Sequence, residues 1–78
     1  MIRESDCVAL TEGLPEVGLK TDDLGTVVLV YEGGKGCEVE FLTIDGDTVA
    51  AVSLFARQVR GVHPDEIARA RRLAVGTG

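Results

Sequence analysis

The sequence is poor in the side chains that fill large cores. Its 78 residues contain no tryptophan, one tyrosine and two phenylalanines. Valine, leucine, isoleucine and alanine must therefore fill most of the interior, and a chain of this length buries only about 60–65% of the surface that its unfolded state exposes. We expect one small domain with a thin core, for which covering further apolar surface by association adds stability.

Reactive side chains are scarce as well. His63 is the only histidine, and the two cysteines, Cys7 and Cys37, lie far apart and form no C-x-x-C pair. Nucleophilic catalysis needs a nucleophile beside a base, and a structural zinc ion needs four ligands. We therefore expect no enzyme, no cofactor, no metal site and no small-molecule substrate. Both cysteines are expected to be buried free thiols on strands, with a disulfide or redox role as the alternative.

No long apolar run occurs in the sequence. The first ten residues, "MIRESDCVAL", lack the apolar segment of a signal peptide, and no segment approaches the length that crosses a membrane. The expectation is a cytoplasmic protein with no membrane contact. In that reducing compartment cysteine thiols stay free.

Positive charge is scarce until the C-terminal part of the chain. Residues 1–56 carry three basic and eleven acidic side chains, a net charge of −8, whereas residues 57–78 carry five basic and two acidic ones, a net charge of +3. An acidic body disfavours binding to nucleic-acid phosphates. The basic tail can contact an acidic partner, a neighbouring subunit or the domain's own body, or it can be a solvated helix face. An alternative is weak nucleic-acid binding through Arg57, Arg60, Arg69, Arg71 and Arg72.

Short apolar segments alternate with turn residues along the first sixty residues. The segment "LGTVVLVYE" is rich in β-branched residues, and "CEVEFLTID" alternates apolar with acidic residues, as a strand with one buried face does. Asp45-Gly46 is typical of a hairpin turn. This pattern predicts an antiparallel meander curled into a small barrel or sandwich. The predicted strands are residues 6–12, 24–32, 37–45 and 48–59, the last breaking near Ala56 into a turn and a final short strand.

Two of these predicted strands are apolar on both faces. In the first of them Val27, Leu29 and Tyr31 alternate with two further valines. Over residues 48–55 both alternating sets are apolar again. Since a strand that faces water on one side alternates with polar residues, we expect part of the outer surface of the barrel to be covered.

The last sixteen residues, "HPDEIARARRLAVGTG", change period. Pro64 suits the first turn of a helix, and the two acidic residues after it suit the positive end of the helix dipole. Such a short helix is not stable alone and needs an apolar surface to lie on. The features predict a helix over residues 63–78, with an apolar stripe formed by Ile67, Ala70, Leu73 and Ala74.

Three segments, "LPEVGLKTDDLGTVVLVY", "EVEFLTIDGDT" and "VSLFARQVR", occur in an order that resembles a known family. The family consists of short bacterial proteins catalogued as a domain of unknown function. The resemblance covers residues 6–60 and implies an SH3-like barrel without assigned catalytic residues. Asp22 stands where a glycine is common in the family's turn, and the tail from His63 onward lies outside the resemblance. Similar barrels occur as enzyme accessory subunits, translation-associated modules and neutralising partners of toxins, which is an analogy of fold.

The combined prediction is a mainly β protein. It comprises an SH3-like antiparallel β-barrel of about five strands over residues 1–62, and a C-terminal helix and tail over residues 63–78 that pack on the barrel or on a partner. The expected function is a non-catalytic protein-interaction module that associates with itself or serves as an accessory or neutralising partner of another protein. The predicted interface is Val27, Leu29, Tyr31, Val49, Phe55, Ile67 and Leu73, with Arg69 and Arg72 at its rim.

Overall fold

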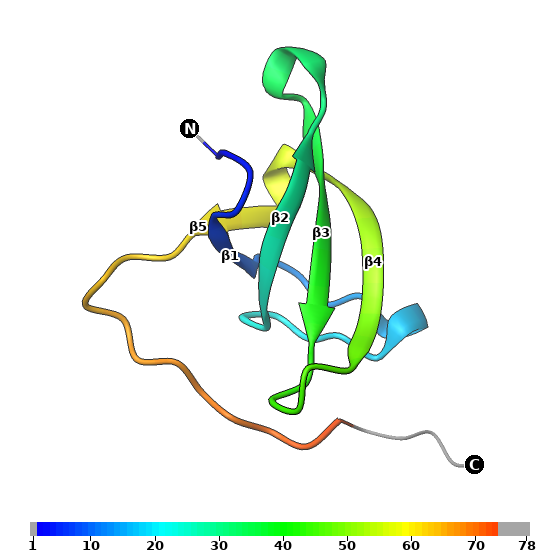
Figure 1. Ribbon diagram of the computed structural model, residues 1–78, viewed down its shortest axis with the longest axis vertical. Helices are drawn as coiled ribbons and strands as arrows, with labels where there is room; N and C mark the ends of the chain where they lie inside the picture. The colour runs from blue at the N-terminus through cyan, green and yellow to red at the C-terminus, as the bar shows by residue number, and fades with distance from the viewer. Residues whose placement is uncertain (1, 74–78) are drawn as a thin grey trace.

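The computed structural model describes residues 2–73, and these form a mainly β structure (Figure 1). The strands are β1 (Cys7–Leu10), β2 (Leu24–Val30), β3 (Gly36–Leu42), β4 (Thr48–Phe55) and β5 (Val59–Gly61). Three single-turn 3₁₀ segments lie between them: η1 (Pro15–Val17), η2 (Glu32–Gly34) and η3 (Ala56–Gln58). No helix in this part of the chain is long and apolar enough to cross a membrane.

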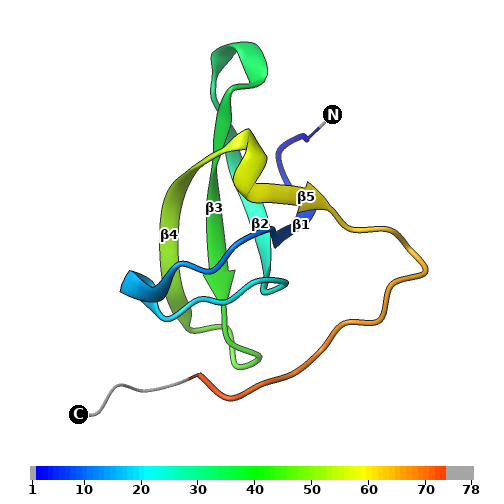
Figure 2. The ribbon, with the colours of Figure 1, turned by 180° about the vertical axis from the view of Figure 1, so that it is seen from behind.

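All five strands belong to one antiparallel sheet with the order β4-β3-β2-β1-β5. The sheet bends sharply, so that β1 and β5 run across the direction of β2, β3 and β4 (Figures 1 and 2). The predicted antiparallel meander is confirmed, and the break predicted near Ala56 is η3. Closure is not observed: β4 and β5 remain the two edges among the described residues, so the sheet is not a closed barrel.

The bend encloses one small hydrophobic core. Phe41 is its largest fully buried side chain, and β3 contributes more core residues than any other strand because its apolar residues alternate with Glu38 and Glu40. The sequence predicted this alternation, with one buried face and one face in water, and the structure confirms it. The core consists of Val8, Leu10, Leu19, Val27, Cys37, Val39, Phe41, Leu54 and Val59.

Left-handed backbone conformations occur in turns that connect the strands. Gly46, in the turn between β3 and β4, has φ +92°, a left-handed conformation that glycine adopts without strain. Asp22 has φ +73°, so it adopts a left-handed conformation that is uncommon for residues other than glycine. The predicted Asp45-Gly46 hairpin turn is therefore confirmed, and Asp22 adopts the left-handed backbone without being a glycine.

A β-bulge in β2 changes which residues face outward. Val27 lies opposite Val39 and Leu29 lies opposite Glu38, so Val28 is an extra residue in β2. Such a bulge reverses the alternation of side chains beyond it. Val27 precedes the bulge, lies opposite the buried Val39 and is 1% exposed, whereas Leu29 beyond the bulge points outward. The prediction that Val27 shares an outward face with Leu29 and Tyr31 is wrong for Val27.

A second bulge lies in β4. Phe41 is paired with Ala50 and Leu42 with Thr48, which leaves Val49 as the extra residue. Val49 is half-buried and packs against the core. It is therefore a core-supporting residue, not the outward residue that strict alternation predicted.

The predicted C-terminal helix is absent from the described part of the tail. Residues 62–73 form one turn at residues 64–65 and are otherwise extended, and Ala74 lies outside the described residues. Ile67, at the start of the predicted apolar stripe, is 89% exposed. Without a surface for its stripe, so short a helix has too little stability to form.

The two thiols differ in exposure. Both cysteines are free and lie on strands, as predicted, but Cys7 on β1 is exposed whereas Cys37 on β3 is buried. The expectation of two buried thiols is therefore wrong for Cys7. Burial also raises the pKa of the Cys37 thiol, which lowers the fraction present as reactive thiolate.

This difference predicts one fast and one slow reaction with a thiol reagent such as Ellman's reagent. The native protein should release one equivalent of chromophore quickly, and the second only when denaturant exposes Cys37. Cys7→Ser should remove the fast phase and leave the slow one. Two fast equivalents in the native protein would contradict the burial of Cys37.

Candidate interaction surface

Of the large apolar side chains exposed along β2, β3 and β4, three lie together near η2, and we term them the outer-face cluster: Leu29, Tyr31 and Phe55. They are 42%, 39% and 61% exposed. Leu29 lies opposite Glu38 of β3, and Phe55 lies opposite Gly36, whose carbonyl accepts a hydrogen bond from the Tyr31 amide. Strand register therefore places the three residues in two adjacent cross-strand rows of one face.

Tyr31 is fixed in place on this face. Its hydroxyl is 2.7 Å from the hydroxyl of Ser53 on β4, within hydrogen-bond distance. Its ring lies beside Gly36, where an added Cβ would be 3.5 Å from Tyr31 Cδ2 and 2.6 Å from the carbonyl oxygen of Leu54. Glycine at position 36 thus lets the aromatic ring lie across β3 and the neighbouring strands stay close.

The cluster has charged neighbours of both signs. The Arg57 guanidinium carbon lies 4.7 Å from the centroid of the Phe55 ring, a cation–π distance. Glu38 and Glu40 are half-buried on the same face of β3, and Glu40 accepts a hydrogen bond from the Thr48 hydroxyl at 3.2 Å. The cluster therefore has an arginine beside Phe55 and a carboxylate beside Leu29.

The edge strand beside the cluster is unusual in composition. β4, with the sequence "TVAAVSLF", contains no charged residue and no proline. Edge strands of soluble proteins usually carry such residues, because they discourage pairing with another chain. The combination of an uncharged edge with an exposed apolar cluster is suited to contact with a protein.

The predicted interface residues of the tail lie elsewhere. Ile67, Arg69, Arg72 and Leu73 are exposed on the extended tail, which returns to the sheet near the turn between β3 and β4, at the end opposite η2 (Figure 1). Residues 68–71 and Leu73 border a hollow together with Ile44 of that turn. The structure thus brings together three of the nine predicted residues, Leu29, Tyr31 and Phe55, and separates them from those of the tail.

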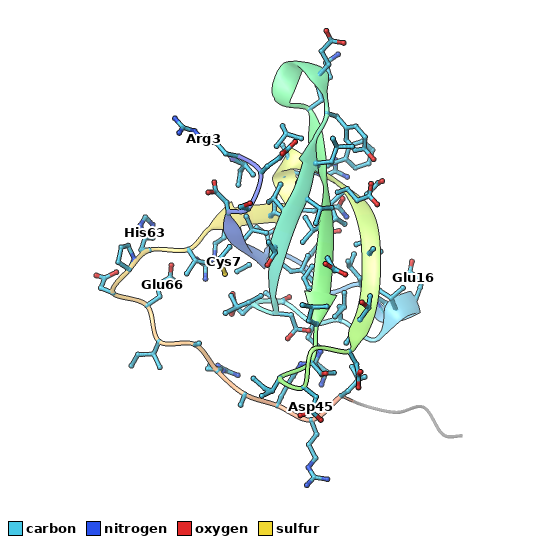
Figure 3. The ribbon with its side chains drawn as sticks, viewed as in Figure 1. Arg3, Cys7, Glu16, Asp45, His63 and Glu66 are labelled. Atoms are coloured by element: carbon cyan, nitrogen blue, oxygen red, sulfur yellow. The ribbon has the colours of Figure 1, made fainter. Side chains whose placement is uncertain are left out.

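The tail is attached to the domain first through Arg60. Its guanidinium is 3.0 Å from the Glu66 carboxylate and 3.4 Å from that of Asp22. Glu66 also accepts a hydrogen bond of 2.8 Å from the backbone amide of His63 (Figure 3). These hydrogen bonds, that of Arg60 first, lower the pKa of Glu66 from its ordinary 4.5 to about 2.

A second attachment lies farther along the tail. Arg71 Nε donates to Asp23 Oδ1 at 2.9 Å, and its Nη2 donates to Asp23 Oδ2 and, at 3.1 Å, to the Gly18 carbonyl. The hydrogen bond from Arg71 lowers the pKa of Asp23. Sequence analysis did not single out Asp23 or Gly18. The sequence feature that pointed to this contact was the acidic body followed by a basic tail, for which contact with the domain's own body was one of several alternatives.

Residues 4–61 match the family described as Domain of unknown function (DUF4926). The chain belongs to this family. No curated protein and no solved structure shows a significant match to the chain.

The matched residues define the DUF4926 domain, and family membership confirms the resemblance seen in the sequence. The domain includes all five strands, the outer-face cluster and the Asp22–Asp23 turn. The tail arginine Arg71 lies beyond the match. The tail contact therefore joins a residue outside the matched segment, Arg71, to one inside it, Asp23.

The Glu66 contact predicts a pH dependence of stability. Because the pKa of Glu66 is lowered in the folded protein, its stabilising contribution is full above the ordinary pKa and is lost as the pH falls through the folded value. We expect Glu66→Gln to lower the melting temperature slightly at neutral pH and to have no effect near pH 2. Thermal unfolding of both proteins between pH 7 and about pH 2 measures this; a difference that grows on acidification would contradict it.

Proposed function

We propose that this DUF4926 protein is a non-catalytic protein-interaction module that associates with a second copy of itself through the outer face of β2–β4. The observation that carries the proposal is the exposed cluster of Leu29, Tyr31 and Phe55. Aromatic residues presented from a rigid sheet are typical anchors of protein interfaces. We place this assembly in the cytoplasm, which agrees with two free thiols.

The charges beside the cluster favour a second copy as the partner. A two-fold interface brings the same surface of both chains together, so a residue of one chain contacts residues of that same surface on the other chain. Arg57 lies over the Phe55 ring, and Glu38 lies opposite Leu29 on β3. A two-fold arrangement can therefore pair Arg57 of each chain with a carboxylate of the other, and the uncharged edge of β4 tolerates close approach.

We further infer an SH3-like arrangement for the DUF4926 domain. Support comes from the sharply bent five-stranded sheet, the order β4-β3-β2-β1-β5 and the 3₁₀ turn between the last two strands. The bend leaves the outward side of β2–β4 broad and accessible. This is the surface on which the proposed contact forms.

Sedimentation equilibrium over the micromolar to millimolar range tests the association. The wild type should shift from the mass of one chain toward that of two. Phe55→Ser should weaken the dimer roughly thirtyfold, since truncating a central interface aromatic costs about 2 kcal/mol or more. A matched control is Ile44→Ser, because Ile44 is also apolar, is 99% exposed and lies on the turn away from the cluster.

Two results would contradict the proposal. One is a wild-type protein that stays monomeric throughout the concentration range. The other is equal weakening by Phe55→Ser and Ile44→Ser, which would indicate a general effect of apolar surface. Nucleic-acid binding through the tail is the less favoured alternative, because Arg60 and Arg71 pair with carboxylates of the same chain.

A further inference from the structure

The tail crosses a hollow at the end of the sheet away from η2. The hollow has a volume of about 390 Å³. Its domain wall, which we term the tail groove, is formed by the 19–24 turn and by residues around the β3–β4 hairpin. The groove residues are Leu19, Asp23, Leu24, Phe41, Leu42, Thr43, Ile44 and Val49.

One position of the groove is built to bind a guanidinium group. Asp23 takes two hydrogen bonds from Arg71, and the Gly18 carbonyl takes a third. The Asp23 carboxylate is itself oriented by the Lys20 amide, which donates to it at 2.8 Å, and its side chain is only 18% exposed. The planar fork of arginine fits this arrangement, whereas the ammonium of lysine cannot make the paired contact.

The tail occupies the groove incompletely. Residues 68 and 70, which border the hollow, are alanines, and an open volume remains between tail and sheet. In the described part of the tail, 62–73, the one backbone–backbone hydrogen bond joins Glu66 to His63 and none joins the tail to a strand. A segment held mainly by two arginine contacts, with few buried apolar atoms, opens at low free-energy cost.

We propose that the tail groove is a binding site for an extended, arginine-bearing segment of a partner protein, and that the tail occupies it in the absence of that partner. The partner segment carries an arginine at the Asp23 position and apolar side chains larger than alanine beside it, which fill the hollow. This proposal does not rest on the outer-face dimer, because the two surfaces lie at different ends of the sheet.

Charge and effective concentration favour a partner protein over the tail of a second copy. Asp22 and Asp23 border an acidic body, so a basic segment is attracted to it. The tail of a second copy would only repeat the contacts of the tail already present, which competes at an effective concentration of about millimolar. A segment must therefore bind better than the tail, and the unfilled hollow provides the space for this.

Fluorescence anisotropy with a labelled nine-residue peptide tests the site. The probe has the sequence of residues 65–73 with Ala68→Leu and Ala70→Leu. In the full chain, Arg71→Gln loosens the tail and leaves the groove intact, and should bind the probe about tenfold or more tightly than the wild type does. Adding Asp23→Asn to Arg71→Gln should remove this gain, as should Arg71→Ala in the probe. Circular dichroism verifies that both variants fold.

Three outcomes would overturn the proposal. Equal affinity of Arg71→Gln with and without Asp23→Asn would show that the carboxylate does not recognise the arginine. Equal affinity of the wild type and Arg71→Gln would show that the tail does not compete. If the unmodified tail sequence binds as tightly as the leucine-bearing probe, exchange of tails between copies replaces the partner protein as the explanation.

Discussion

Phe41→Ala is expected to destabilise the fold by about 3–5 kcal/mol, the cost of removing a fully buried phenylalanine. Phe41 is the largest buried side chain in a core of only nine residues. A domain of this size has a total stability on the order of 4–12 kcal/mol. The variant should therefore unfold at a much lower urea concentration or be largely unfolded in buffer, as followed by far-ultraviolet circular dichroism.

Phe55→Ala is the matched control, because it removes the same atoms from the opposite face of the sheet. Phe55 is mostly exposed, so its replacement should cost well under about 1 kcal/mol in the monomer. The pair thus separates packing from association: Phe41 acts on folding and Phe55 on the proposed dimer. Similar losses of monomer stability in both variants would contradict the assignment of inner and outer faces.

Gly25→Ala should destabilise the fold by about 1–3 kcal/mol, because it overpacks the core. A Cβ at this position would lie 2.6 Å from Val39 Cγ1 and within 2.9 Å of two ring carbons of Phe41. Gly25 is buried and paired with Val8 in the centre of the sheet, so the backbone has little freedom to move away. Urea unfolding of the variant measures the loss.

Gly61→Ala is a closely matched control. Gly61 pairs with the same residue, Val8, from the other side, and a Cβ there would meet nothing within 4 Å. Replacing such a glycine reduces the entropy of the unfolded chain and should be neutral or stabilise by about 0.4–1 kcal/mol. Equal effects of the two changes would mean that the contact with Phe41 does not determine the need for glycine at position 25.

Periodicity in the sequence was sufficient to locate the strands, but it did not always predict which face of a strand a residue occupies. The inner face of β3 follows from alternation alone, whereas β4 is apolar on both faces, so alternation did not show which of its faces lies outward. Val27 and Val49 were misplaced because each lies at a bulge, and an extra residue in one strand shifts the alternation. Neither position carries a glycine or another local residue that signals a bulge, so pairing with β3 had to be known first.

For the tail, the periodicity predicted an element that is absent from its described part. Its sequence satisfies the period and the charge distribution of a helix, yet no helix forms in its described part. Local preference for a short helix is weak, and the ion pairs of Arg60 and Arg71 hold the segment extended between two points of the domain. The contact of a basic tail with an acidic turn was among the alternatives that the charge division left open, but its partners, Asp22 and Asp23, could be identified only in three dimensions.

In the proposed dimer, a second chain covers the outer face of β2–β4. Amide ¹H–¹⁵N correlation spectra of the wild type, recorded at increasing protein concentration, test it at each residue. Signals of residues 29–31 and 53–57 should shift together with concentration, whereas those of β1 and β5 should stay constant. The proposed dimer would be contradicted by spectra that do not change with concentration, or by shifts confined to the tail groove.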